Sequence, residues 1–493
     1  MMILRVISGA QLSEYEFEEG ESVLSILQRN NRKFDAPCGG NGTCKKCRVR
    51  ESGRKEWSLA CRMFPKEDLT IELPKRQDEF SIVSDRKGTE YESGRDGYGI
   101  AIDIGTTTIV ISLEGQPDSG ICQPEAILNE QRIYGADVIS RIKASNEGKS
   151  AELCQLIRSG LTDGIRSLLR RCLVPPQEIR QIAIAGNTTM IHLLLEYPCD
   201  KLGEYPFTPY SLSPESCGAD ALFDLPGLTC EVLIFPGISA FVGGDIVAGL
   251  YAEEIVQREK TMLFLDLGTN GEMAIGNGKR LIVTSAAAGP AFEGGKITWG
   301  TGSIAGAVSG FSLSEPGGVV TIGGERPCGI CGSGVVEIMA ELIEHGIVDE
   351  TGLLADEYFE DGFPVAEMES GEAIVFTQKD IRELQMAKGA IRAGLEILAA
   401  KWGTNIRNID EIIIAGGFGF HLNLKKACRI GLLPPECMGK MRAVGNTSLA
   451  GARKVLSAGG IGDDIYRILE IAEEVNLAKE EEFQEIYMNQ MYF

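Results

Sequence analysis

A short strand-and-turn motif occurs twice in this chain, and it constrains the fold more than any other feature. The first copy is Ile102-Asp103-Ile104-Gly105-Thr106-Thr107-Thr108, and the second is Leu265-Asp266-Leu267-Gly268-Thr269-Asn270-Gly271. Each copy is an apolar run that carries one aspartate and ends in glycine and small polar residues. Such a strand can deliver a carboxylate to a metal ion and then turn tightly around phosphate groups. Two copies predict two halves that close on one nucleotide.

Length and charge narrow the class of protein. With 493 residues the chain is too long for one ordinary core, and several domains are expected. The net charge of −22, from 48 Lys and Arg against 70 Asp and Glu, argues against binding to nucleic acid or an anionic membrane. No apolar run is long enough to span a bilayer, and the N-terminus is too soon polar for a signal peptide. We therefore expect a cytoplasmic protein.

Four of the 14 cysteines form a spaced set near the N-terminus, whereas most of the others are scattered as small buried hydrophobes would be. The gaps between Cys38, Cys44, Cys47 and Cys61 are five, two and thirteen residues. Glycines between the first two can point backbone N–H groups at sulfur, which stabilises bound thiolates. With its short strands and one helix, the segment resembles ferredoxin domains of the 2Fe–2S type, which have a β-grasp fold. The alternative is a structural zinc site, although zinc sites usually use two close cysteine pairs.

These observations predict a ferredoxin-like domain over residues 1–76, followed by a linker over residues 77–97. The linker segment is mostly polar, contains several glycines and lacks clear periodicity. A flexible linker would let the cysteine-bearing domain move relative to the rest of the chain. An ordered strap across the larger domain is the alternative.

The first copy of the motif continues into a second apolar run, Ile109-Val110-Ile111-Ser112-Leu113, which predicts a β-hairpin. It has neither the Gly-Lys-Ser/Thr of a P-loop nor the three-glycine turn of a Rossmann site. A hairpin with aspartate at its entry resembles the phosphate-1 element of the superfamily that contains sugar kinases, actin, acetate kinase and heat-shock chaperone ATPases. This resemblance implies a multidomain α/β protein with an actin-like ATPase body over 98–493, in lobes of approximately 98–260 and 261–493.

Other segments match further elements of that superfamily in the expected order. Residues 135–142, with Asp137 near their start, resemble a first connecting helix. Residues 265–272 resemble the phosphate-2 element. The strand and glycine turn over 412–419 resemble an adenosine motif, and the small residues of 445–452 resemble a second connecting helix.

The resemblance and the residue types together predict an ATP site. Asp103 and Asp266 suit Mg²⁺, which takes one or two carboxylates and keeps several waters. Asp137 is the candidate for ordering the attacking water. For each of these three candidate catalytic aspartates, a helix cap or turn role is the alternative. The residues expected to contact the nucleotide are Gly105, Thr106, Thr107, Thr108, Gly268, Thr269, Asn270, Gly416 and Gly417.

Two weaker patterns are open to a structural interpretation. Gly243-Gly244-Asp245 precedes a helical stretch and favours a capping role. Cys328 and Cys331 have a two-residue spacing at an expected helix start, but one pair cannot close a metal site alone. Packing is the favoured interpretation, and a redox or ligating role is the alternative.

The combination of both halves resembles the reductive activators of corrinoid-dependent methyltransferase systems over almost the full length, including Ile184-Ala185-Gly186-Asn187-Thr188-Thr189. The resemblance implies an iron–sulfur enzyme that uses ATP to transfer one electron from a 2Fe–2S cluster to an inactive cobalt(II) corrinoid protein, restoring cobalt(I). It also implies an anaerobic cell and an external low-potential electron donor. Larger members carry extra sequence after the ferredoxin part, and the short linker here leaves little room for it. The sequence leaves room for a homodimer.

Two alternatives combine similar parts. One is an activator of a radical dehydratase, whose cluster lies within the ATPase domain; iron bound by Cys328 and Cys331 would favour it. The other is a small-molecule kinase regulated by its cluster, which would require a phosphorylated product.

Overall fold

The computed structural model of the chain describes residues 2–8, 11–30, 40, 42, 47–54, 57–73, 97–115, 122–135, 137–268, 270–314 and 317–493. The expected linker over 77–97 lies outside the described residues apart from Gly97. Three residues singled out in the sequence, Cys38, Cys44 and Thr269, also lie outside them.

The N-terminal domain is a five-stranded sheet of order β2-β1-β5-β3-β4 with one helix, α1 (Val23–Arg29). β1 pairs antiparallel with β2 and parallel with β5, as in a β-grasp fold. Ser22 caps α1 by accepting a hydrogen bond from the Ser25 amide, and the apolar face of α1 is buried against the sheet. The strands are β1 (Met2–Ser8), β2 (Gln11–Phe17), β3 (Arg48–Glu51), β4 (Trp57–Leu59) and β5 (Leu69–Glu72).

The first lobe of the body is built on a six-stranded sheet of order β10-β11-β9-β6-β7-β8. Its middle strands are almost continuously apolar and buried on both faces, as the sequence runs predict. The strands are β6 (Tyr98–Ile104), β7 (Thr108–Glu114), β8 (Glu125–Leu128), β9 (Ile179–Gly186), β10 (Glu215–Gly218) and β11 (Glu231–Ile234). The helices are α2 (Val138–Ala144), α3 (Ser150–Cys172), α4 (Thr188–Leu195) and α5 (Gly244–Ala252).

The second lobe repeats this plan with a sheet of order β21-β20-β12-β13-β14-β22. Its strands are β12 (Met262–Leu267), β13 (Gly271–Gly276), β14 (Leu281–Ala286), β20 (Glu411–Ala415), β21 (Met441–Gly445) and β22 (Ala472–Glu474). Two small sheets accompany it, made of β15 (Ala307–Phe311), β16 (Val319–Thr321) and β17 (Gly329–Ile330), and of β18 (Phe363–Glu367) and β19 (Ala373–Phe376). The helices are α6 (Gly332–Glu344), α7 (Asp356–Phe359), α8 (Gln378–Trp402), α9 (Gly417–Phe420), α10 (Leu424–Arg429), α11 (Thr447–Ala458), α12 (Asp463–Ile471) and α13 (Phe483–Asn489).

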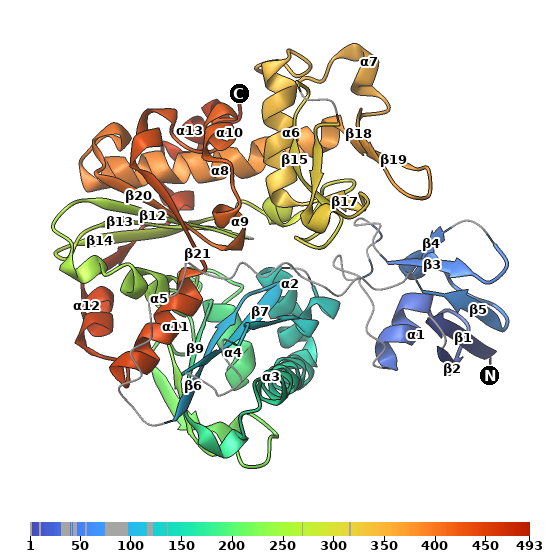
Figure 1. Cartoon of the computed structure of the whole chain (residues 1–493), viewed down its shortest axis with the longest axis horizontal. Helices are drawn as coiled ribbons and strands as arrows, with labels where there is room; N and C mark the ends of the chain where they lie inside the picture. The colour runs from blue at the N-terminus through green and yellow to red at the C-terminus, as the bar shows by residue number, and fades with distance from the viewer. Residues whose placement is uncertain are drawn as a thin grey trace.

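The two sheets have the same internal order, which places the two copies of the motif in equivalent positions. In each lobe a hairpin has one parallel neighbour and one antiparallel neighbour: β9-β6-β7-β8 in the first and β20-β12-β13-β14 in the second. Figure 1 shows the lobes one above the other, with the N-terminal domain beside both. This arrangement is the two-lobed α/β fold expected from the sequence.

Helices α5 and α11 pack against each other where the lobes meet, and α11 also lies on β6 and β9 of the first lobe (Figure 1). A Cβ atom on Gly451 of α11 would collide with the backbone of Ala248 in α5, so only glycine permits this close approach. The expectation that residues 135–142 form the first connecting helix is wrong. Residues 138–144 do form a helix, α2, but it packs against α4, and α5 is the helix that meets α11.

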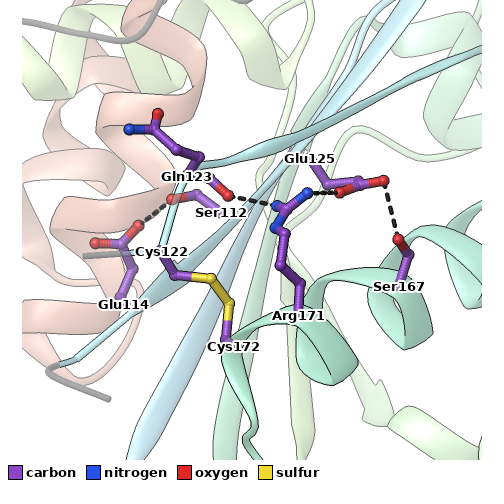
Figure 2. The surroundings of a disulfide bond; sticks show 8 residues. All are labelled: Ser112, Glu114, Cys122, Gln123, Glu125, Ser167, Arg171 and Cys172. Carbon is purple, nitrogen blue, oxygen red and sulfur yellow. Dashed lines mark hydrogen bonds and ion pairs between the residues drawn. A yellow bond between two sulfur atoms is a disulfide. The ribbon is translucent and has the colours of Figure 1, made fainter. Parts of the chain in front are cut away.

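One pair of cysteines departs from the expectation of scattered buried hydrophobes. Cys122 and Cys172, 50 residues apart, form a disulfide that ties the chain before β8 to the end of α3 (Figure 2). Next to it, Arg171 donates to the Glu125 carboxylate at 2.5 Å and to the Gln123 carbonyl at 2.6 Å. Several other cysteines, such as Cys154 and Cys437, are buried as expected.

Among the described residues, no helix combines the length and the apolar composition that a membrane-spanning helix requires.

Candidate functional site

The turn between β6 and β7 is held by a network of backbone hydrogen bonds. The Gly105 amide donates to the Thr108 carbonyl at 3.1 Å, and a Cβ atom at Gly105 would lie only 2.5 Å from that oxygen. Asn129, after β8, supports the turn from the other side. Its backbone amide donates to the Thr107 carbonyl at 2.9 Å and its side chain to the Gly105 carbonyl at 3.0 Å. The turn therefore has a rigid backbone in which glycine is required.

The side chains of this turn face both lobes. Thr106 accepts a hydrogen bond from the Asn187 amide at 3.1 Å, within the first lobe. Thr107 donates to Glu293 of the second lobe at 3.2 Å. Thr108 begins β7. The hydroxyls predicted to contact phosphate thus lie at the boundary between the lobes.

Asp103 is held by residues far away in the sequence. Its two carboxylate oxygens accept hydrogen bonds from the Asn446 side-chain amide and the Ser448 hydroxyl, each at 2.7 Å. Asn446 is also the N-cap of α11. The second connecting helix predicted from the sequence therefore places its first turn directly against the carboxylate of the first motif.

The second turn also has a hydrogen bond from its glycine amide to a backbone carbonyl, but the partner lies two residues on rather than three. The Gly268 amide donates to the Asn270 carbonyl at 3.0 Å. Gly416, in the turn after β20, has a φ of +89°, and a Cβ atom there would lie 2.7 Å from an Asp266 carboxylate oxygen. Gly417 begins α9, and a Cβ atom on it would meet nothing within 4 Å. Asp266 and the predicted adenosine turn are thus in direct contact.

Asp245 and Glu272 lie near Asp103 and Asp266. Burial and the proximity of these carboxylates raise the pKa of three of them. Burial and the neighbouring Asp245 and Asp103 raise the pKa of Asp266 to about 8. Burial and Asp103 raise the pKa of Asp245 to about 7. Burial, Asp245 and Asp266 raise the pKa of Glu272 well above its usual value. Without a counter-ion, this concentration of negative charge between the lobes is unfavourable.

Strand register explains why two of these acids meet. Asp266 on β12 and Glu272 on β13 are direct cross-strand partners, so both side chains lie on the same face of the sheet. Like charges in directly opposed positions destabilise a sheet. Their placement is therefore better explained by a bound cation than by stability.

The donor set fits Mg²⁺ together with phosphate. No group of three or more His, Cys, Asp or Glu side chains among the described residues converges as a ready-made metal site. Mg²⁺ usually takes only one or two protein carboxylates, with waters and phosphate oxygens completing its octahedron. Asp103 and Asp266, at equivalent strand ends, fit that requirement.

Asp137 has a clear structural role. It is the N-cap of α2, where it accepts hydrogen bonds from the Ser140 amide at 2.8 Å and the Ser140 hydroxyl at 3.1 Å. The next turn of α2 carries Arg141, which is fully buried and donates to the Thr106 carbonyl at 2.6 Å. The capping role given as the alternative is thus present, and the role of Asp137 toward water stays a prediction.

In the N-terminal domain, two of the four predicted ligands lie within the described residues. Cys47 and Cys61 are both buried, and their sulfur atoms are 3.3 Å apart. Two thiolates on one tetrahedral metal with bonds of about 2.3 Å stand roughly 3.8 Å apart. The pair is therefore placed to share one metal atom with little movement, as a cluster requires.

The second cysteine pair has backbone partners. The Cys331 thiol lies 3.2 Å from the Val308 carbonyl, and the Cys328 thiol lies 3.5 Å from the Ala305 carbonyl. Cys331 is also the N-cap of α6, and burial raises the pKa of the Cys328 thiol. Both contacts fit the packing role favoured by the sequence.

Four residues of this region were not assigned a site role from the sequence: Asp245, Glu272, Asn446 and Ser448. Glu272 directly follows the second motif, and its carboxylate could have been noticed there. Asp245 has a sequence signal, the preceding glycine pair, that favours capping equally well. The contacts of Asn446 and Ser448 with Asp103 span more than 340 residues and have no local signal.

Comparison with family models places three known regions in this chain. Residues 9–66 match the 2Fe–2S iron–sulfur cluster binding domain. Residues 98–258 match the middle region of RACo, and residues 260–493 match the C-terminal domain of RACo, the ASKHA domain.

Three known proteins are similar to this chain. The corrinoid activation enzyme RamQ of Eubacterium limosum is 33% identical over 423 residues, covering 80% of this chain and 70% of that protein. The [Co(II) methylated amine-specific corrinoid protein] reductase of Methanosarcina barkeri is 28% identical over 289 residues, covering 54% of this chain and 52% of that protein. The solved structure of a reductive activator for corrinoid, iron–sulfur protein superposes with a TM-score of 0.72 at 27% identity, covering 100% of this chain and 98% of that one.

With a ferredoxin-type domain, a RACo middle region and an ASKHA domain in this order, the chain belongs to the family of corrinoid activation enzymes.

Proposed function

We propose that this protein is an ATP-dependent reductive activator that delivers one electron to an inactive cobalt(II) corrinoid protein and restores cobalt(I) for methyl transfer. The observation that carries the proposal is a set of four neighbouring carboxylates between the lobes, those of Asp103, Asp245, Asp266 and Glu272. The same chain has a ferredoxin-like domain with two closely placed cysteines. The relatives named above are an activation enzyme, a reductase and a reductive activator of corrinoid proteins.

The N-terminal domain holds the redox group in this proposal. A bound 2Fe–2S cluster supplies a one-electron carrier of low potential. Cys38, Cys44, Cys47 and Cys61 are its proposed ligands. The closely placed sulfur atoms of Cys47 and Cys61 support their assignment to one iron, while Cys38 and Cys44 would hold the other.

The body is proposed to bind MgATP between its lobes. Asp103 and Asp266 would hold the hydrated Mg²⁺, and the backbone amides and hydroxyls of the two turns would bond the phosphates. Asp137 is the proposed residue for ordering the attacking water. It lies one helical turn before Arg141, whose guanidinium donates to the Thr106 carbonyl. The proposed nucleotide contacts are Gly105, Thr106, Thr107, Thr108, Gly268, Thr269, Asn270, Gly416 and Gly417.

The proposed reaction combines the transfer of one electron with the hydrolysis of ATP. Cobalt(II) gains one electron and becomes cobalt(I), and an external low-potential donor replaces that electron. ATP and water become ADP and phosphate. For one electron, each 30 mV of uphill potential costs about 0.7 kcal/mol, so nucleotide-driven conformational work can offset a few hundred millivolts. We expect this activity in the cytoplasm, where ATP and low-potential carriers meet.

A reduction assay tests the proposal. The purified protein, reconstituted with iron and sulfide, is mixed with a cobalt(II) corrinoid protein and a low-potential chemical reductant, and the cobalt(I) absorption band is followed with and without MgATP. We expect MgATP to stimulate the band. The absence of ATP-stimulated reduction with every corrinoid protein of the same cell would reject the proposal.

A variant separates catalysis from folding. Asp266→Ala is expected to abolish ATP stimulation while leaving the visible spectrum of the ferredoxin domain intact. The matched control is Asp163→Ala, at a surface carboxylate of α3 whose side chain is 71% exposed. Loss of the spectrum together with the stimulation would mean that the substitution unfolds the protein.

A further inference from the structure

The ferredoxin-like domain contacts both lobes of the body. From α1, the Gln28 side-chain amide donates to the carbonyl of Ile133 in the first lobe at 3.2 Å. From β3, the Arg48 guanidinium lies 5.8 Å from the ring centroid of Trp299 in the second lobe, within cation–π range. Figure 1 shows the domain beside both lobes, with α1 and β3 on its side toward the body.

The contact surface of the small domain includes the strand that follows the buried cysteine. Arg48 is the residue after Cys47, whose sulfur lies 3.3 Å from that of Cys61. The Cys47 carbonyl accepts a hydrogen bond from the Ala60 amide at 2.7 Å, which ties the two cysteine segments together. When Arg48 contacts Trp299, the start of β3 next to Cys47 therefore faces the body rather than a partner protein.

On the first lobe, the contact adjoins the turn between β6 and β7. Ile133 ends the short 3₁₀ helix Glu130–Ile133, which begins directly after Asn129. Asn129 in turn bonds the backbone of Gly105 and Thr107. Ile133 is therefore connected to that turn by one short segment, Asn129 to Ile133, whose first residue is bonded to the turn.

On the second lobe, Trp299 lies close in sequence to Glu293, the residue that contacts the turn between β6 and β7. Trp299 lies six residues after Glu293, whose carboxylate accepts the Thr107 hydroxyl at 3.2 Å. The Trp299 carbonyl accepts a hydrogen bond from the Ile330 amide at 2.8 Å, which anchors it to the lobe. Both contacts of the ferredoxin-like domain thus lead back to Thr107.

We infer that Gln28 and Arg48 form a latch that seats the ferredoxin-like domain across the two lobes, and that nucleotide phosphate at Thr107 releases it. The inference rests on the proposed nucleotide site. A phosphate group that takes the Thr107 hydroxyl also repels the negative Glu293 carboxylate, so the bond between the lobes at this point is lost. Ile133 and Trp299 then move relative to each other, and a rigid domain cannot keep both contacts. Each contact is weak alone, which suits a reversible latch.

Small-angle X-ray scattering of the full chain with its cluster tests the latch without measuring corrinoid reduction. Without nucleotide, we expect the Gln28→Ala/Arg48→Ala double variant to have a larger radius of gyration than the wild type. A non-hydrolysable ATP analogue with Mg²⁺ is expected to shift the wild type toward the value of the double variant and to leave the double variant unchanged. Trp299→Ala should behave like the double variant, which guards against an effect confined to the small domain.

Arg54→Ala is the matched control, because Arg54 lies on the same domain, is 71% exposed and pairs with Glu51 at 2.9 Å. It should scatter as the wild type does in both states. The visible spectrum must be retained in each variant, so that a change in scattering reports domain position. Equal radii for wild type and double variant without nucleotide would overturn the latch, and a wild type that ignores the analogue would overturn its release by phosphate. A latch that behaves as expected in a protein that reduces no corrinoid protein would contradict the proposed function alone.

Discussion

At the residue scale, the molecule places like charges where a folded protein ordinarily avoids them. Asp266 and Glu272 face each other across β12 and β13, and Asp103 and Asp245 lie near enough to raise the pKa of their neighbours. A cation bound between the lobes, as proposed for Mg²⁺, would turn this repulsion into binding. The same residues that make the ligand-free protein less stable are thus the ones expected to hold MgATP.

The pH dependence of stability tests this arrangement. The pKa of Asp266 is about 8 in the folded protein, compared with an ordinary value of 3.8. The folded state therefore binds more protons than the unfolded state between these values, and its stability falls as the pH rises through 8. For ligand-free protein, we expect the thermal midpoint of the wild type to fall from pH 5 to pH 9, and that of Asp266→Asn to fall less.

MgATP provides the second half of that test. It should raise the midpoint of the wild type and have little effect on Asp266→Asn, since a ligand at 100 times its Kd contributes about 2.7 kcal/mol. The exposed Asp163→Asn should follow the wild type throughout. Parallel curves for wild type and Asp266→Asn would contradict the assignment of a perturbed, cation-binding carboxylate.

Two glycines with a similar positive φ but different ψ, 155° at Gly416 and 28° at Gly403, test whether the turn after β20 belongs to the nucleotide site. Gly416 has a φ of +89° and Gly403 a φ of +85°, but a Cβ atom meets Asp266 and Leu267 at the first and nothing within 4 Å at the second. Gly403→Ala should cost about 1 kcal/mol from the left-handed conformation alone. Gly416→Ala should cost roughly 1–3 kcal/mol more, because its backbone lies in a region that is nearly restricted to glycine and because the added Cβ atom overpacks the turn. It should also weaken MgATP binding. Differential scanning fluorimetry with and without MgATP measures both, and equal effects would show that the turn after β20 is remote from the site.

At the element scale, the parts that were predictable from the sequence are the local ones. The apolar runs around each motif are long enough to identify both hairpins, β6-β7 and β12-β13, because strand, turn glycine and return strand are contiguous. The helix after Gly445 was equally recognisable from its small residues and is α11. Its contact with Asp103 was not, because it joins residues from opposite ends of the body.

The choice of connecting helix shows the limit of local patterns. Residues 135–142 and 243–252 both begin with glycine and an aspartate close to a helix start, so local sequence alone does not decide which of them is the connecting helix. Packing decides between them: the glycines of α5 and α11 allow the two helices to touch, whereas α2 packs on α4. Asp245 is consequently brought to the site and Asp137 acts as a cap.

The disulfide between Cys122 and Cys172 is expected to stabilise the first lobe around β8 and α3. It ties the chain just before β8 to the end of α3, and β8 leads directly to Asn129 beneath the first turn. Closing a loop of 50 residues contributes about 4 kcal/mol in the chain-entropy model. Under non-reducing conditions, Cys122→Ser should therefore have a lower thermal midpoint than the wild type.

Thermal midpoints measured with and without a reductant isolate the contribution of this disulfide. With dithiothreitol the wild type should lose its advantage and melt together with Cys122→Ser. Cys217→Ser, at a partly exposed thiol of the same lobe, should differ from the wild type equally with and without dithiothreitol. If the thermal midpoint of the wild type is the same with and without dithiothreitol, the disulfide does not stabilise this lobe.

At the scale of the whole molecule, a small redox domain is joined to two lobes of matching sheet order. The lobes meet where α11 of the second lobe lies on β6 and β9 of the first and contacts Asp103. The ferredoxin-like domain contacts the first lobe through Gln28 and the second through Arg48, close to the residues that bond Thr107. In the proposed mechanism, nucleotide bound between the lobes acts on the position of the redox domain through these short segments.

In the proposed function, nucleotide bound between the lobes drives an electron from the N-terminal domain to cobalt, and a single-turnover experiment can measure this coupling. The protein is reduced, freed of excess reductant and mixed with a cobalt(II) corrinoid protein, while the iron–sulfur and cobalt(I) absorption bands are followed together. With MgATP we expect one cobalt(I) to form for each N-terminal domain oxidised, at matching rates, and Asp266→Ala to behave as the wild type does without ATP. If cobalt(I) forms equally fast without ATP, or without oxidation of the N-terminal domain, nucleotide does not drive electron transfer from this domain to cobalt.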